Sequence, residues 1–123
     1  MTVPTRQPVG RVLFVEDDQD VTKSMIRWFK LHDWTPIHFS SVKPALQALK
    51  KEPFNLVFTD WNLFGDTSEP LVREALKQGI PVRICSGRDA PKGLGLEAVW
   101  LSKSGDCLKQ LNTLLEEIGK GSS

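Results

Sequence analysis

Short apolar runs alternate with amphipathic stretches along this chain, and the alternation predicts repeated strand and helix units on a parallel sheet. Five runs are expected to form strands, at residues 11–15, 35–39, 55–59, 81–85 and 98–101. The first run is almost continuously apolar, which is typical of a strand whose two faces are both covered by helices. The sequence therefore predicts an α/β protein with a central parallel sheet.

Amphipathic stretches between the runs predict the helices that cover this sheet. The first helix is expected from an N-cap at Asp20 to His32, because apolar residues at i, i+4, i+7 and i+8 from Val21 share one face. Three more helices are expected, after Ser40 or Ser41, after Thr67 or Ser68, and from Ser104 to Ile118.

The stretch between the fourth and fifth strands breaks this regularity. Pro91, Gly93 and Gly95 fall within residues 86–96, so a helix there is expected to be short or missing. The full prediction is a doubly wound, flavodoxin-like sheet of five parallel strands in the order 2-1-3-4-5, with a short or missing fourth helix.

Length and charge limit the kind of protein. At 123 residues the chain is long enough for one domain, which we assign to residues 9–118, with a flexible extension at 1–8 and a flexible tail at 119–123. Lys and Arg number 16 against 15 Asp and Glu, so the formal net charge is +1, and a strongly basic nucleic-acid-binding surface is excluded.

Apolar runs and cysteines suggest the compartment. No run is long enough for a membrane span or a signal peptide, so we expect a cytoplasmic protein without membrane partners. The two cysteines, Cys85 and Cys107, lack metal-ligand spacing and are expected to be reduced thiols in buried positions.

Acidic residues directly follow two of the predicted strands. Glu16 and Asp17 follow the first strand, and Asp60 follows the third. With the predicted strand order, these two strands are neighbours, and ligands of such sheets bind at the carboxyl edge where the strand order reverses. Three carboxylates in one crevice repel one another unless a cation is bound. Oxygen ligands without clustered His or Cys favour a hard ion, and a shallow, open site suits Mg²⁺ better than Ca²⁺.

Two more polar features are expected at the same edge. Ser86 and Gly87 follow the fourth strand, and Lys103 lies just beyond the fifth. Together with the acidic residues, in this order and each at a strand end, they resemble the site of the receiver domains of two-component response regulators, the CheY-like family. The resemblance covers about residues 9–118.

The resemblance implies a phosphoacceptor at Asp60 that takes a phosphoryl group from a histidine kinase or a histidine phosphotransfer protein. It implies Mg²⁺ as the cofactor, held directly by Asp17 and Asp60, through water by Glu16, and by the backbone carbonyl of Asn62. Such a protein promotes its own phosphorylation and dephosphorylation, so it is not an enzyme in the ordinary sense. It would signal by contact with a downstream protein or an attached domain.

The resemblance also implies phosphate-binding and switching residues. Ser86, Gly87 and Lys103 would contact the phosphoryl group through a hydroxyl, a backbone N–H and an ammonium group. Ser86 and Trp100 would form the switch, although Trp100 stands where the family often has a tyrosine. Because an indole is bulkier and its single donor is placed differently, we expect the coupling between hydroxyl and aromatic ring to be altered.

Other departures from the family pattern lie in segments through which receivers transmit their signal to partners. Phe64 replaces a proline that usually follows the acceptor, so the loop after Asp60 is expected to take a different path. The shortened stretch after Ser86 lies where receivers commonly bind partners or dimerise. A second reading is therefore a receiver-like interaction module that works without phosphorylation. A third is a Mg²⁺-dependent phosphatase, which the lack of an acid at position 62 disfavours.

Overall fold

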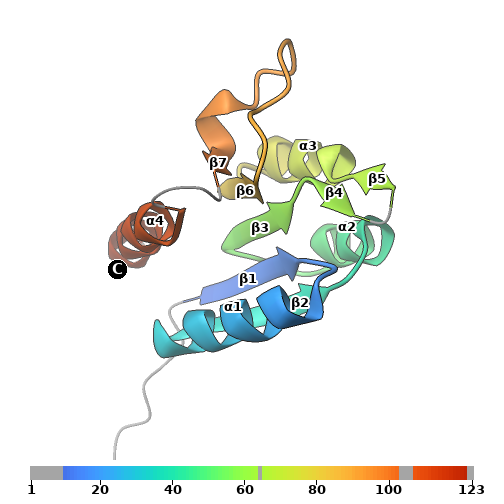
Figure 1. The fold of residues 1–123 in the computed structure, drawn as a ribbon. Helices are drawn as coiled ribbons and strands as arrows, with labels where there is room; N and C mark the ends of the chain where they lie inside the picture. Colours follow the sequence, from blue (N-terminus) through green and yellow to red (C-terminus); the bar gives the residue numbers. More distant parts are fainter. Residues whose placement is uncertain (1–9, 64, 103–106, 122–123) are drawn as a thin grey trace, which may run out of the picture.

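The computed structural model describes residues 10–63, 65–102 and 107–121 (Figure 1). Its strands are β1 (Gly10–Val15), β2 (Trp34–Phe39), β3 (Leu56–Asp60), β4 (Asn62–Leu63), β5 (Asp66–Thr67), β6 (Val82–Ser86) and β7 (Trp100–Ser102). Its helices are α1 (Gln19–Leu31), α2 (Val42–Lys51), α3 (Glu69–Gln78), the short 3₁₀ helix η1 (Glu97–Val99) and α4 (Cys107–Gly121). None of these helices in the described ranges is long and apolar enough to span a membrane.

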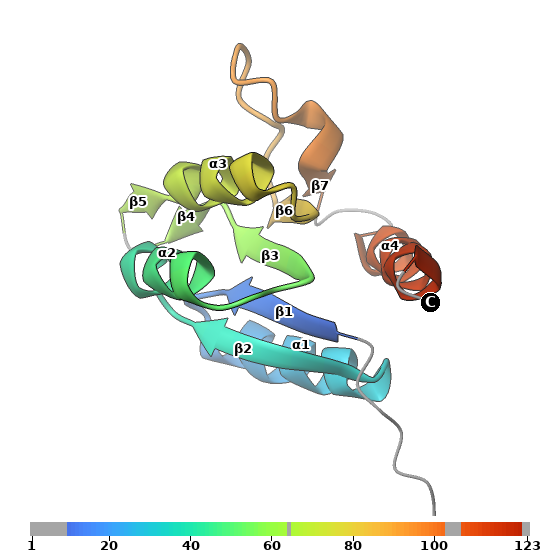
Figure 2. The same ribbon diagram turned by 180° about the vertical axis from the view of Figure 1, so that it is seen from behind.

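Five strands form one parallel sheet in the order β2-β1-β3-β6-β7. Because β6 and β7 are the fourth and fifth predicted strands, this confirms the predicted order. From β1 the chain first adds β2 on one side and then β3 on the other, so the strand order reverses between β1 and β3 (Figures 1 and 2). The carboxyl edge at this point is where a sheet of this kind binds ligands.

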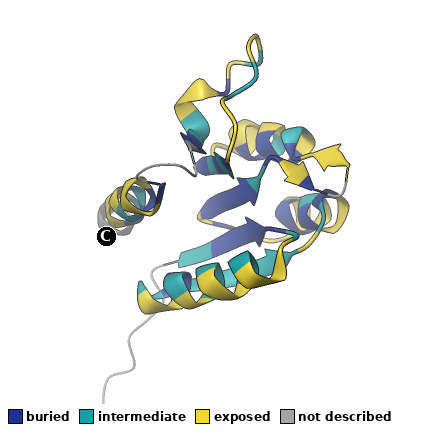
Figure 3. Cartoon of the chain, in the orientation of Figure 1, coloured by how far each residue is buried: buried dark blue, intermediate teal, exposed yellow. Residues whose placement is uncertain are grey.

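Helices cover both faces of the sheet. On one face, α1 and α4 pack on a cluster that includes Phe14, Phe29 and Phe58, and on the other α2 and α3 pack on a cluster that includes Leu13 and Val57 (Figures 1 and 2). The alternate side chains of β1 thus enter two separate cores, which is why its sequence is apolar at successive positions. The centre of the sheet is accordingly buried (Figure 3).

Two helix ends differ from the sequence prediction. The N-cap of α1 is Asp18, whose Oδ1 accepts hydrogen bonds from the backbone N–H groups of Asp20 (2.9 Å) and Val21 (3.0 Å). The predicted cap at Asp20 is therefore wrong. Asp20 lies in the first turn, where its negative charge interacts favourably with the helix dipole.

At the other end of the chain, α4 continues to Gly121, into the stretch predicted as a flexible tail. The predicted extension at 1–8 and the predicted helix start at Ser104 lie outside the described residues.

The connection from β6 to β7, residues 87–99, contains only η1 and no α-helix, which confirms the short or missing fourth helix. Gly93 and Gly95 adopt positive φ angles of 85° and 71°, which an α-helix does not allow. We call this connection the β6–β7 arm, and it projects away from the sheet in both ribbon views (Figures 1 and 2).

A small hairpin after β3 was not expected from the sequence pattern. β4 and β5 pair antiparallel on either side of a turn in which Gly65 has a φ of 83°. The hairpin is closed at its base by a hydrogen bond from the Ser68 N–H to the Trp61 carbonyl, at 2.8 Å. Phe64, the predicted point of departure from a family loop, lies outside the described residues.

Candidate functional site

The predicted acidic cluster forms at the point where the strand order reverses. Glu16 and Asp17 follow the last residue of β1, and Asp60 is the last residue of β3. Because β1 and β3 pair in parallel, with Val15 opposite Thr59, the two strand ends lie side by side. One ligand atom from each of Glu16, Asp17 and Asp60 lies within 4.8 Å of the others. The structure therefore brings together the three carboxylates that the sequence placed at separate strand ends.

Glu16 is held in this position by backbone and side-chain hydrogen bonds. Its side chain is buried, with 5% exposure, and its Oε1 accepts hydrogen bonds from the N–H groups of Asp17 and Asp18, both at 3.2 Å. Its own N–H donates to the Phe39 carbonyl of β2 at 3.1 Å. These contacts fix the conformation of the acidic loop directly after β1.

His38 also fixes this loop, a role that no sequence motif indicates. Its Nε2 lies 2.9 Å from the Glu16 carbonyl oxygen. Because a carbonyl oxygen only accepts, Nε2 carries the proton and donates. The β1–β2 register places His38 opposite Phe14, two residues before Glu16, so this contact follows from strand pairing once the register is known.

Asp60 is half-buried, and a backbone N–H group at the end of β3 orients its carboxylate. Its Oδ1 accepts a hydrogen bond from the Trp61 N–H at 2.7 Å, and the Thr59 hydroxyl donates to the Asp60 carbonyl at 2.8 Å. Trp61 itself is buried in the core beneath α2 and α3. The acceptor candidate is thus attached to a rigid strand and a buried indole, which limits its side-chain motion.

Ser86 and Gly87 stand on the strand next to Asp60. Asp60 pairs with Cys85 in the β3–β6 register, so Ser86 lies one residue beyond the acceptor candidate. Ser86 is buried, and its Oγ accepts a hydrogen bond from the Arg88 N–H at 3.3 Å. A Cβ added to Gly87 would meet no atom within 4 Å, so packing does not require glycine there. Lys103, the predicted phosphate-binding ammonium, lies outside the described residues.

Trp100 is already anchored to the β6–β7 arm. Its Nε1–H donates to the Arg88 carbonyl at 2.7 Å, and its ring lies 5.2 Å, centroid to centroid, from that of Trp61. Trp61 directly follows Asp60, so an aromatic contact links the acceptor strand to β7. Asn62, the predicted carbonyl ligand, is exposed on β4 and pairs with Thr67.

The donor set of the acidic cluster fits a hard divalent cation. All three groups are carboxylates, and Asp17 and Asp60 are partly exposed while Glu16 is buried. Oxygen donors of this kind, open to solvent on one side, suit Mg²⁺ with several retained waters. The cluster thus has the chemistry for a bound cation next to a half-buried carboxylate.

Fold and site together define a class: a doubly wound α/β protein with a carboxylate cluster at its switch point. The sequence matches no family model and no curated protein significantly, whereas solved structures match over nearly the whole chain. The receiver domain of a Francisella response regulator is 21% identical, with a TM-score of 0.75, covering 93% of this chain and 99% of that one.

Two further solved structures are of the same kind. A CheY-like response regulator receiver domain from Methanospirillum hungatei is 21% identical, with a TM-score of 0.75, covering 94% of this chain and 99% of that one. The response regulator TrrA from Thermotoga maritima, determined in complex with Mg²⁺ and BeF, is 15% identical, with a TM-score of 0.72, covering 88% and 97%. The chain therefore has the fold of response-regulator receiver domains, as its motifs indicated.

The cluster predicts a measurable effect of Mg²⁺ on stability. At free Mg²⁺ tenfold above its Kd, binding to the native state alone adds about 1.4 kcal/mol to the free energy of unfolding. For a domain of this size, that raises the melting temperature by about 5 °C. Thermal unfolding followed by circular dichroism, with and without Mg²⁺, measures the shift.

Two aspartates provide a matched pair of variants. Asp17→Asn is expected to lose most of the Mg²⁺-dependent shift, whereas Asp20→Asn, an exposed residue of α1 outside the cluster, is expected to keep it. Equal shifts in both variants, or no shift in the wild type, would contradict a cation site at the cluster.

Proposed function

We propose that this protein is a phosphoacceptor receiver domain of a two-component system, which takes a phosphoryl group onto Asp60 from a phosphohistidine of a histidine kinase or phosphotransfer protein. The observation that carries the proposal is the convergence of Glu16, Asp17 and Asp60 within 4.8 Å at the switch point of the sheet. The receiver fold of the chain supports it.

In the proposed reaction an Asp60 carboxylate oxygen attacks the phosphorus in line with the bond to the phosphohistidine nitrogen. The new O–P bond forms as the P–N bond breaks, and the imidazole leaves and takes up a proton. Phosphoryl transfer needs little covalent work from the protein, so alignment and charge neutralisation dominate. The Trp61 N–H and the rigid end of β3 supply alignment by fixing the direction of the carboxylate.

A divalent cation fits the acidic cluster, and Asp17 and Asp60 would hold it, with Glu16 acting through water and the Asn62 carbonyl as a further ligand. When bound, Mg²⁺ supplies positive charge beside the transferred phosphoryl oxygens. The complex of TrrA with Mg²⁺ and BeF supports this assignment, because that protein shares the fold. The buried Glu16 and its two backbone N–H donors keep the cluster assembled.

The remaining contacts to the phosphoryl group are proposed for three residues. Ser86 would donate its hydroxyl and Gly87 its backbone N–H, both from the strand end adjacent to Asp60. Lys103 would add an ammonium group. Water then hydrolyses the acyl phosphate and regenerates the carboxylate, so the protein modifies itself and turns over no separate substrate.

One observation favours a second reading, an interaction module that works without phosphorylation. The β6–β7 arm contains no α-helix, whereas helices make the connections between the other consecutive strands of the sheet, so the surface presented beside the site differs from a helical one. In either reading the signal leaves by contact with another protein or an attached domain.

Intact-mass spectrometry after incubation with acetyl phosphate and Mg²⁺ tests the proposed reaction. The wild type is expected to gain one phosphoryl group, and chelation of Mg²⁺ is expected to slow the gain at least about tenfold. Asp60→Asn should gain none, whereas Asp66→Asn, an exposed aspartate of the β4–β5 hairpin, should behave as the wild type. A wild type that stays unmodified would favour the interaction module, and turnover of phosphomonoesters would favour a phosphatase.

Amide exchange tests the altered switch. The Trp100 indole already bonds to Arg88 and packs on Trp61, so a phosphoryl mimic at Asp60 is expected to change exchange in residues 87–101 less than about tenfold. Trp100→Phe loses the indole donor, and its arm should exchange about fivefold faster even without the mimic. Strong new protection of Trp100 upon addition of the mimic would contradict this account and indicate a family-type switch.

A further inference from the structure

We propose that Cys85 and Cys107 form a redox modification site: hydrogen peroxide or a related hydroperoxide converts the two thiols into a reversible intramolecular disulfide that joins β6 to α4. The site is separate in chemistry from the carboxylate cluster and does not depend on the proposed phosphoryl transfer. It is built from two residues that lie 22 positions apart in the sequence.

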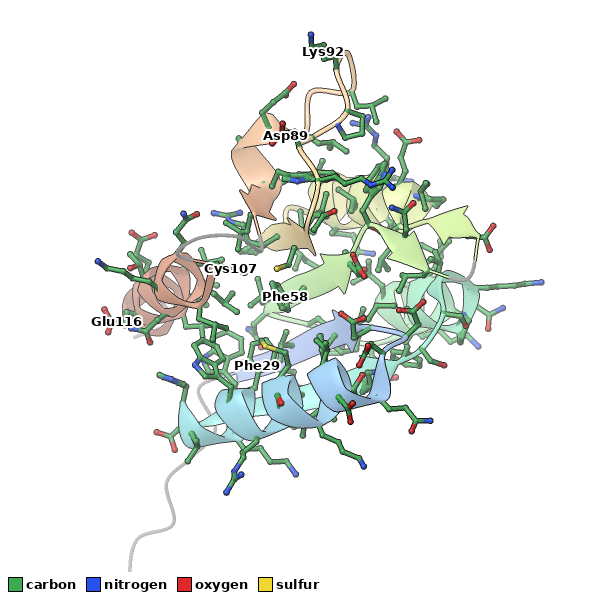
Figure 4. The ribbon with its side chains drawn as sticks, viewed as in Figure 1. Phe29, Phe58, Asp89, Lys92, Cys107 and Glu116 are labelled. Carbon is green, nitrogen blue, oxygen red and sulfur yellow. The ribbon has the colours of Figure 1, made fainter. Side chains whose placement is uncertain are left out.

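The two sulfur atoms are close enough to bond with little movement. Cys85 lies in β6 and Cys107 is the first residue of α4, and their Sγ atoms are 2.9 Å apart. A disulfide bond is about 2.0 Å long, so the sulfurs need to approach by only about 0.9 Å. In Figure 4, Cys107 lies on the side of α4 that faces the sheet and Phe58. Both side chains therefore point into the same space between α4 and β6.

A cavity gives small oxidants a route to this pair. It has a volume of about 280 Å³ and is lined by both cysteines together with Met25, Leu108 and Asp60. Cys85 is half-buried and Cys107 keeps 8% of its surface exposed. A peroxide molecule can enter a cavity of this size, and the 2.9 Å between the two Sγ atoms places each thiol directly beside the other. Intramolecular pairing is thus favoured over crosslinking between molecules.

The proposed step balances in atoms and electrons. One thiol, as its thiolate, attacks an oxygen of hydrogen peroxide; the O–O bond breaks, leaving a sulfenic acid and one water. The second thiol attacks the sulfenic sulfur; the S–S bond forms and a second water leaves. Two thiols are oxidised by two electrons and one peroxide is reduced to two waters. A dithiol such as dithiothreitol reverses the step by thiol–disulfide exchange.

The disulfide would change how α4 is attached to the sheet. Among the described residues of this helix, those buried in the core are Cys107, Leu111 and Leu115. Cys85 is the register partner of Asp60, so the new bond would fasten α4 to the strand that flanks the acidic cluster. It also closes a loop that contains the β6–β7 arm and Lys103, which reduces the freedom of the unfolded chain.

The test treats the fully reduced chain with a slight excess of hydrogen peroxide and measures the intact mass before and after alkylation under denaturing conditions. The wild type is expected to lose two hydrogens, to take up no alkylating reagent, and to yield one linked peptide pair containing positions 85 and 107. Dithiothreitol should restore two alkylatable thiols. The oxidised protein should melt at least about 5 °C higher than the reduced one.

Three variants separate this site from the proposed function. Cys85→Ser and Cys107→Ser should form no internal bond, show no rise in their own melting temperature after peroxide treatment, and give a dimedone adduct of the sulfenic acid at the remaining cysteine. Asp17→Asn, a change in the acidic cluster but outside the cavity lining, should form the disulfide as the wild type does, so a failure of phosphorylation leaves this result intact. Two alkylatable thiols remaining after treatment, disulfide-linked dimers, or an oxidised protein that melts no higher would each overturn the proposal.

Discussion

The parallel pairing of β1 with β3 determines where the acidic cluster of this protein forms. Val15 lies opposite Thr59, so the next residue of each chain segment, Glu16 after β1 and Asp60 at the end of β3, lies at the same edge of the sheet. A shift of one residue in this register would turn the side chains of one strand to the opposite face. The two apolar cores resist such a shift because they take alternate side chains of β1, Val12 and Phe14 on one face and Leu13 and Val15 on the other.

The β1–β3 register brings three carboxylates together, and hydrogen bonds within the protein offset only part of their mutual repulsion. Three carboxylates within 4.8 Å repel one another at a cost of about 1 kcal/mol for each pair, even at the dielectric constant of water. The backbone N–H donors to Glu16 and the proton of His38 hold the loop in place against this repulsion. A bound cation would offset this repulsion, so the proposed function and the stability of the site are linked.

Much of this arrangement could be predicted from the sequence, because it depends on local patterns. The strands, their order and the meeting of Glu16, Asp17 and Asp60 follow from apolar runs that end in acids. The cap of α1 was misplaced by two residues, since Asp18 and Asp20 are equivalent in composition and only backbone geometry selects Asp18. Contacts such as those of His38 and of the cysteine pair depend on tertiary packing between elements, which no local pattern encodes.

The proposed function requires that Asp60 carries the acyl phosphate. Borohydride reduces an acyl phosphate of aspartate to homoserine, so reduction after treatment with acetyl phosphate and Mg²⁺, followed by peptide mapping, locates the modified residue directly. We expect homoserine at position 60 and at no other aspartate, with none formed when the phosphodonor is left out. Homoserine at Asp17 or at another position, or an unchanged peptide map, would contradict it.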